Sequence, residues 1–170
     1  MALSAGGGIS LVHGAWKYYG EAIHQRTQSD ADQDFLKYVA GFSYRETKLA
    51  NRFFGFDEIQ PVIEYAGEWI ASEQKEDGYL TNSKEARPGK NSLIFRLNIL
   101  HNDTWSYSLH GTRNLEDNDY ALGVGVEYKY NDNLSFTMTA QSYDGDDDTQ
   151  FGRWRRNDNL ELGVKYIFGL

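Results

Sequence analysis

Apolar and polar residues alternate along most of the chain, and clusters of Asn, Asp and Gly interrupt the alternation. A period of two residues is typical of β-strands with one apolar face, whereas the helical period of about 3.6 residues is almost absent. In residues 120–130, tyrosine, leucine and valine fill the even positions and alanine, glycine, glutamate and lysine the odd ones. The pattern predicts an all-β protein.

The alternation predicts eight strands in one domain covering residues 1–170. The predicted strands are residues 11–23, 36–44, 59–71, 93–100, 105–112, 120–130, 134–141 and 160–168. In the first strand, Val12 is expected to share a face with Trp16 and Tyr18. Residues 1–10 are expected to form a flexible start, and residues 47–57 a connecting loop.

The connections between the predicted strands differ in length in a regular way. Residues 27–34, 73–91 and 144–159 are long polar loops after odd-numbered strands, with residues 114–119 as a short exception. Turns of three or four residues follow the fourth and sixth strands. This alternation is typical of outer-membrane barrels, whose short turns face the periplasm. Both chain ends are then expected on the short-turn side.

The apolar faces point either into a soluble barrel of the lipocalin type or outward into lipid. They carry so many Trp, Tyr and Phe rings that the narrow interior of an eight-stranded barrel would be overpacked. The opposite faces are rich in Gly, Ala, Ser and Thr. The volume of the rings therefore favours apolar faces that point into lipid, and so predicts an antiparallel up-and-down transmembrane β-barrel.

The rings gather near the strand ends and the aliphatic residues near the strand middles. This arrangement is expected of a membrane barrel, in which the rings lie at the two lipid interfaces and the aliphatic side chains lie between them. The predicted lipid-interface aromatics are Trp16, Tyr44, Trp69, Trp105, Tyr107, Tyr128, Tyr130, Tyr166 and Phe168. The charges of the polar face are nearly balanced, which predicts cross-strand ion pairs. The predicted lumen-lining residues are Lys37, Arg45, Glu64, Glu68, Arg96, His110, Glu127, Lys129, Glu161 and Lys165.

Composition excludes several other classes of function. The formal net charge is −8 and the only basic cluster is residues 153–156, so a nucleic-acid partner is not expected. The chain has no cysteine, and its histidines are too scattered to form a metal site. No run approaches the roughly 20 apolar residues of a membrane-spanning helix. The chain does not start with a signal-peptide pattern, so we expect either a cytoplasmic chain or a mature or partial one.

Three polar groups are candidates for chemistry. Ser108, His110 and Glu127 share a face, but Glu127 is expected opposite Ser106, so no catalytic relay is predicted and the chain is not expected to be an enzyme. The acidic run 144–148 could bind a cation or remain a solvated loop. The cluster formed by Arg153, Trp154, Arg155 and Arg156 is suited either to lipopolysaccharide phosphates or to neighbouring aspartates.

The end of the chain carries the most specific motif. Residues 160–168 alternate apolar and polar, with Tyr166 two positions before Phe168. This run resembles the C-terminal assembly signal of Gram-negative outer-membrane β-barrel proteins, although Gly169 and Leu170 follow the phenylalanine. The resemblance implies location in the bacterial outer membrane, with lipid, lipopolysaccharide and the barrel-assembly machinery as partners. It implies no cofactor and no particular family.

The expected function is a porin-like passive channel for small solutes, or the C-terminal part of one. A second hypothesis is a self-contained eight-stranded barrel with a structural or surface-binding role. An outer-membrane lipid hydrolase and a soluble lipocalin-like carrier are further alternatives. Eight strands suffice for a small closed barrel, but larger barrels enclose the water-filled channel that conduction requires.

Overall fold

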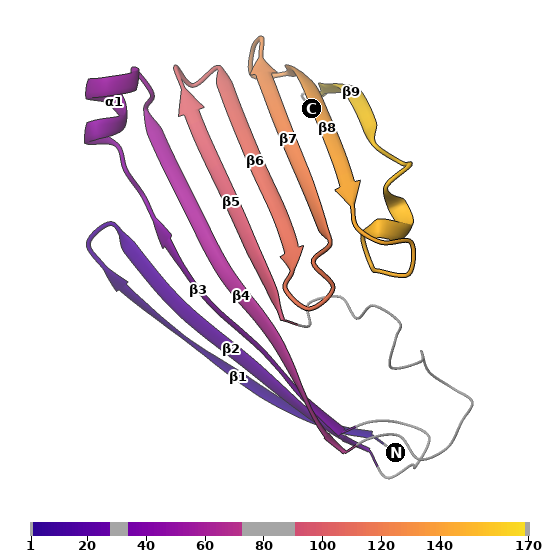
Figure 1. Ribbon diagram of the computed structural model, residues 1–170. Coiled ribbons are helices and arrows are strands. Elements are labelled where there is room, and N and C mark those ends of the chain that lie inside the picture. Colours follow the sequence, from indigo (N-terminus) through magenta and orange to yellow (C-terminus); the bar gives the residue numbers. More distant parts are fainter. Residues whose placement is uncertain (1, 28–33, 73–90, 169–170) are drawn as a thin grey trace.

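The computed structural model describes residues 2–27, 34–72 and 91–168, which form one antiparallel sheet with two short helices (Figure 1). Nine described strands lie in space in their sequence order. They are β1 (Ala2–His13), β2 (Trp16–Thr27), β3 (Asp34–Tyr44), β4 (Glu58–Ser72), β5 (Ser92–His101), β6 (Trp105–Asn114), β7 (Tyr120–Lys129), β8 (Leu134–Asp144) and β9 (Asn159–Tyr166). The helices are α1 (Lys48–Phe54) and the 3-10 helix η1 (Gly152–Trp154). No helix in these ranges is long and apolar enough to cross a membrane.

The expected all-β, antiparallel, up-and-down meander is confirmed, but the described sheet is open rather than closed into a barrel. β1 and β9 stand at its two edges. Because the strand number is odd, β1 and β9 run in the same direction. Joining these edges directly would make a parallel pair, whereas closure by antiparallel pairs alone requires an even number of strands.

The ninth strand comes from the start of the chain, where the sequence predicted none. Ala2–His13 pairs with β2 along its whole length, so the prediction for residues 1–10 is wrong. The predicted first strand, 11–23, is divided by a turn at Gly14, whose φ is 60°. His13 pairs with Trp16, which places Val12 opposite Lys17 and on the other face from Trp16. Three consecutive glycines hid this strand, because glycine adds nothing to an apolar alternation.

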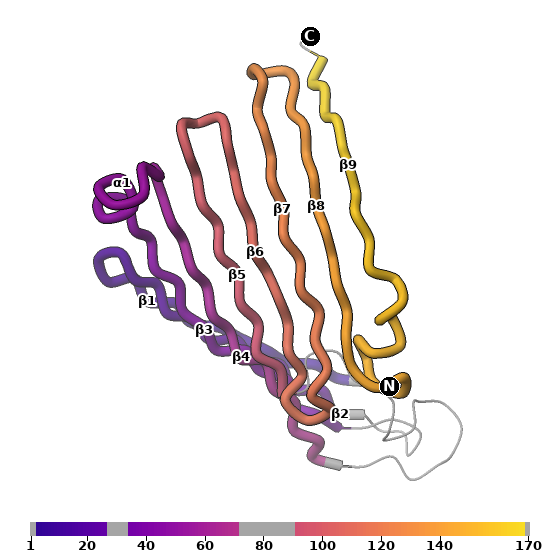
Figure 2. The backbone as a smooth tube through the Cα atoms, turned by 45° about the horizontal axis from the view of Figure 1, so that its top comes forward, coloured from indigo at the N-terminus to yellow at the C-terminus, as the bar shows by residue number. Residues whose placement is uncertain are grey.

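The two chain ends lie at opposite ends of the sheet rather than both on the short-turn side (Figure 2). β1 starts at the long-loop end and β9 finishes at the short-turn end, as the odd strand number requires. The expected loop 47–57 is also wrong in part, because it contains α1. Most of the predicted loops 27–34 and 73–91 lies outside the described residues.

The strands are progressively staggered across the sheet. One line of register partners runs from Val12 in β1 through Arg96 and His110 to Asn159 in β9. Val12 lies ten residues after the start of β1 and one before its end. Asn159 is the first residue of β9 and lies seven before its end. The strand ends are therefore displaced in one consistent direction.

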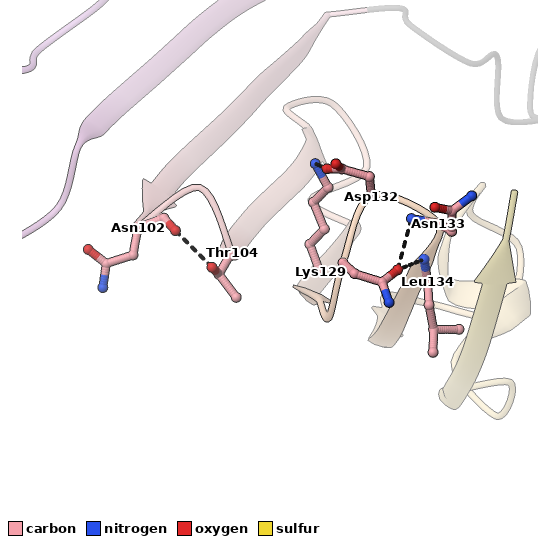
Figure 3. Close-up of polar contacts among 7 residues, drawn as sticks. Asn102, Thr104, Lys129, Asp132, Asn133 and Leu134 are labelled. Atoms are coloured by element: carbon pink, nitrogen blue, oxygen red, sulfur yellow. Dashed lines mark hydrogen bonds and ion pairs between the residues drawn. The ribbon is translucent and has the colours of Figure 1, made fainter. Parts of the chain in front are cut away.

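The short turns are closed by local polar contacts (Figure 3). Asn102 and Asp103 both have positive φ, 55° and 51°, the geometry that two-residue hairpins prefer. In the β7–β8 turn, the Asn131 side-chain oxygen accepts hydrogen bonds from the backbone N–H groups of Asn133 and Leu134, both at 2.9 Å. These contacts fix the register of the hairpins.

Apart from Val12, the register confirms that the predicted apolar positions share one face of the sheet. Leu97 pairs with Leu109, Leu109 with Val124, and Val124 with Ala140. Within residues 2–27, 34–72 and 91–168, no second layer of strands or helices covers this face. In the described ranges, Ala50 and Ala66 are the buried apolar residues, whereas Leu162 is 75% exposed. A sheet with such a face is unfavourable in water, because apolar surface is costly to hydrate.

Candidate functional site

The polar face of the sheet is the candidate functional surface. The register places the predicted lumen residues on it: Lys37 pairs with Glu68, Arg96 with His110, Ser106 with Glu127, Lys129 with Ser135, Thr139 with Glu161, and Ser135 with Lys165. Glu64 lies four residues before Glu68, on the same face of β4. Arg45 follows the last residue of β3. The strand residues of this set therefore share one face of the described sheet, whereas their role in lining a lumen stays a prediction.

A three-residue network joins β2, β4 and β5 on this face. The Tyr19 hydroxyl donates to Glu64 Oε1 at 2.7 Å, and Arg96 Nη2 donates to Glu64 Oε2 at 2.6 Å. The Glu64 side chain is 12% exposed, and these two donors each engage one of its oxygens. A part-buried carboxylate is stable when each oxygen has a partner of this kind. The network holds three strands in a fixed arrangement.

Gly41 makes this network possible. Tyr19 reaches Glu64 across β3, and Gly41 is the β3 residue that lies between them. A Cβ atom at Gly41 would meet Glu64 Cγ and Tyr19 Cζ, each at 2.9 Å. The missing side chain therefore leaves room for the phenol ring to lie over the sheet.

Two further ion pairs lie toward the edges of this region. Lys37 Nζ is 3.5 Å from Glu68 Oε2 between paired positions of β3 and β4. Arg45 Nη2 is 2.6 Å from Glu58 Oε2, close to the short-turn end. Cross-strand ion pairs were predicted from the balanced charges, and these contacts confirm that they form. Glu58 was not among the predicted residues, although it falls on the polar side of the alternation in β4.

On the polar face of β6 and β7, two side chains lie over glycines of the neighbouring strand. Ser108 lies over Gly125 and His110 over Gly123, which leave space for these side chains. Glu127 pairs with Ser106, as the sequence predicted, and stands four residues along β7 from Gly123, the partner of His110. Ser108, His110 and Glu127 are therefore not brought together as a relay.

The predicted interface aromatics lie on the apolar face near the strand ends. At the short-turn end, ring centroids are 4.5 Å apart for Trp16 and Tyr44, and 4.6 Å for Trp105 and Tyr128. Trp105 also stacks on Tyr107, and Tyr166 meets Phe168 edge-on at 4.8 Å. Tyr130 is exposed in the turn between β7 and β8. Trp69 lies near the opposite end and is 62% exposed. We call the short-turn group, Trp16, Tyr44, Trp105, Tyr107, Tyr128, Tyr166 and Phe168, the aromatic belt.

The β8–β9 connection carries the basic cluster and the acidic run. Arg155 Nη2 lies 3.0 Å from Asp147 Oδ1, so one of the arginines pairs with a neighbouring aspartate. Arg153 donates to the Thr149 carbonyl, and Trp154 is about half exposed. The described residues contain no group of three or more His, Asp or Glu side chains suited to a metal ion. The buried Asp119 anchors this connection by accepting the Phe151 N–H at 2.5 Å.

Sequence reasoning missed Tyr19, β1 and α1. Tyr19 lies midway between Lys17 and Glu21 in the alternation, which was the available signal that it belongs to the polar face. Its ring, however, made it resemble the residues of the apolar face. Comparison with protein-family models, with curated proteins and with solved structures finds no match for this chain.

Proposed function

We propose that this chain forms the wall of a porin-like β-barrel in a bacterial outer membrane, through which small solutes pass. The uncovered apolar face carries the proposal, since it extends over all nine described strands and has the aromatic belt at one end. Lipid would cover this face without a second protein layer, and rings at strand ends suit the depth of lipid headgroups. The polar face would then line the channel.

The stagger of the strands supports the same proposal. From β1 to β9 the strand ends are displaced by six residues at the short-turn end and ten at the long-loop end. With a rise of about 3.4 Å per residue and about 4.8 Å between strands, ends that lie in two parallel planes require a tilt of about 30–40°. Membrane barrels have strand tilts of roughly 35–45°.

A self-contained barrel with a structural role is the second candidate. It is favoured by the Tyr19–Glu64–Arg96 network, because side chains that cross the polar face fill a narrow lumen. The two candidates differ in conductance across a planar bilayer. The chain refolded in lipid should conduct ions in the first case and stay silent in the second.

Adjacent positions on β8 test the lipid-facing assignment itself. Met138 lies on the apolar face and Thr139 on the polar face. In a bilayer, Met138→Arg should destabilise the fold by about 2–4 kcal/mol, whereas Thr139→Arg should cost far less. The measurement is the denaturant midpoint in vesicles, with heat-modifiable gel migration as the check on folding. Equal effects of the two substitutions would count against a membrane wall.

A further inference from the structure

The helix α1 presents an apolar side next to the aromatic belt. Leu49 is 53% exposed, and Phe53 and Phe54 are each 66% exposed. Leu49 and Phe53 are four residues apart and so share one side of the helix. Ala50, which is 1% exposed, marks the side that packs against the protein. Asn51 lies on the side opposite Leu49 and Phe53, since successive residues turn by about 100°.

Ring contacts connect this helix to the sheet. Phe54 stacks on Phe56 at 6.3 Å, and Phe56 lies 6.4 Å from Tyr107 of the aromatic belt. Phe56 also meets His101 edge-on at 5.7 Å. A series of ring contacts therefore connects the belt, through Phe56, to Phe54 of the helix.

The cationic residues of α1 lie beside its apolar side. Lys48 and Arg52 are four residues apart, exposed, and point away from the side of Ala50. The Arg52 guanidinium lies 5.5 Å from the Phe53 ring centroid. Exposed Leu and Phe beside Lys and Arg form the pattern of helices that rest in a lipid interface, where the cations reach the phosphates.

We propose that α1 is an interfacial helix, in which Leu49, Phe53 and Phe54 enter the phospholipid boundary at the short-turn end and Lys48 and Arg52 contact lipid phosphates. This inference rests on the proposed membrane wall. Continuity with the aromatic belt identifies lipid as the occupant of this surface. The helix would fix the depth of the barrel by meeting the interface from outside the strand ends.

The absence of cysteine from the chain allows a direct test. Phe53→Cys, Asn51→Cys and Val124→Cys each accept one nitroxide label, and each variant is reconstituted in phosphatidylcholine vesicles containing phosphatidylglycerol. The readout is the ratio of label accessibility to oxygen, which concentrates in lipid, over accessibility to a water-soluble nickel chelate. Val124, in the middle of the apolar face, reports on the membrane wall independently of α1.

We expect the ratio at position 53 to exceed that at position 51 several-fold and to lie below that at position 124. Equal ratios at positions 53 and 51, with position 124 immersed, would overturn the interfacial helix and leave the membrane wall intact. Low accessibility to both reagents at position 53 would indicate a protein partner and would also overturn it. A water-exposed label at position 124 would overturn the membrane wall. Heat-modifiable migration of each labelled variant confirms that it is folded.

Discussion

The Tyr19 hydroxyl donates a 2.7 Å hydrogen bond to Glu64, reaching from β2 to β4 over the strand between them. Neighbouring strands in a sheet lie about 4.8 Å apart, so a contact that skips one strand requires a long side chain on one partner and little obstruction between. Tyr19 supplies the length and Gly41 the gap. The polar face is thus tied across three strands by side chains as well as by the backbone ladder.

Removing this hydroxyl should weaken the sheet measurably. Tyr19→Phe keeps the ring but leaves one Glu64 oxygen without its donor, which should cost about 1–2 kcal/mol because the acceptor is charged and part-buried. The free energy of unfolding in lipid or detergent is the measurement. Tyr18→Phe is the matched control, since Tyr18 directly precedes Tyr19 in the chain but lies on the apolar face. A loss equal to that of the control would mean that the hydrogen bond contributes nothing.

Gly41 gives a second test of the same network. Gly41→Ala places a Cβ 2.9 Å from Glu64 Cγ and from Tyr19 Cζ, so both side chains must move, and we expect destabilisation of about 1–3 kcal/mol. Gly20→Ala is the control on β2, where the nearest atom is the Val39 carbonyl oxygen at 3.6 Å. The difference between the two denaturant midpoints measures the crowding. No difference would show that Tyr19 is free to leave its position.

Sequence alternation predicted most of the sheet because each strand has one apolar face. The segment around Val124 shows why. Its branched and aromatic residues occupy every second position, so a shift of one residue in the strand register would move all of them to the other face of the sheet. The method failed at Gly6, Gly7 and Gly8, where there was no side chain to count. It also assigned Val12 to the wrong face, since a two-residue turn reverses the chain without leaving a strong polar signal.

The polar face could be predicted as a set of residues but not as a set of contacts. Lys37 and Glu68 are recognisable as charges of the polar face, yet their pairing depends on a register that is fixed by loops and turns elsewhere. The network of Tyr19 is harder still, because it joins strands that are not neighbours. The barrel was inferred from the volume and placement of the rings on eight predicted strands, and the unrecognised strand Ala2–His13 changed the strand count to nine.

Glu46 provides a pH-dependent prediction outside the strands. The hydrogen bond from the Tyr44 hydroxyl, at 2.5 Å, and the one from the Leu49 N–H, at 2.7 Å, lower the pKa of Glu46 below its ordinary value. Its stabilising effect on the start of α1 should be present above the ordinary pKa and lost as pH falls through the lowered pKa. Carbon NMR of the side-chain carboxyl measures this titration.

Tyr44→Phe should move the pKa of Glu46 back toward its ordinary value, since the hydroxyl is the largest cause of the shift. The unsubstituted chain, titrated under the same conditions, is the reference. A Glu46 that titrates identically with and without the Tyr44 hydroxyl would contradict the prediction.

The outer edge of β1 should be paired in the assembled protein. The Arg45 N–H donates to the Ala15 carbonyl, so odd-numbered β2 residues bond to β3 and even-numbered ones to β1. Given the β1–β2 register, the N–H groups of Gly6, Gly8 and Ser10 then point away from β2. Residues 2–12 contain no charge or proline to protect this edge, and unsatisfied backbone groups are very costly in lipid.

Amide hydrogen exchange in reconstituted protein tests this edge. We expect Gly6, Gly8 and Ser10 to exchange as slowly as Gly7 and Ile9, which bond to β2. Protection that persists with one chain per lipid nanodisc would indicate a partner strand within the same chain, whereas protection lost on dilution would indicate a neighbouring copy. Fast exchange at the even positions beside slow exchange at the odd ones would mean that β1 is a free edge. A free edge of this length cannot stand in hydrocarbon, so that outcome would also argue against a closed membrane wall.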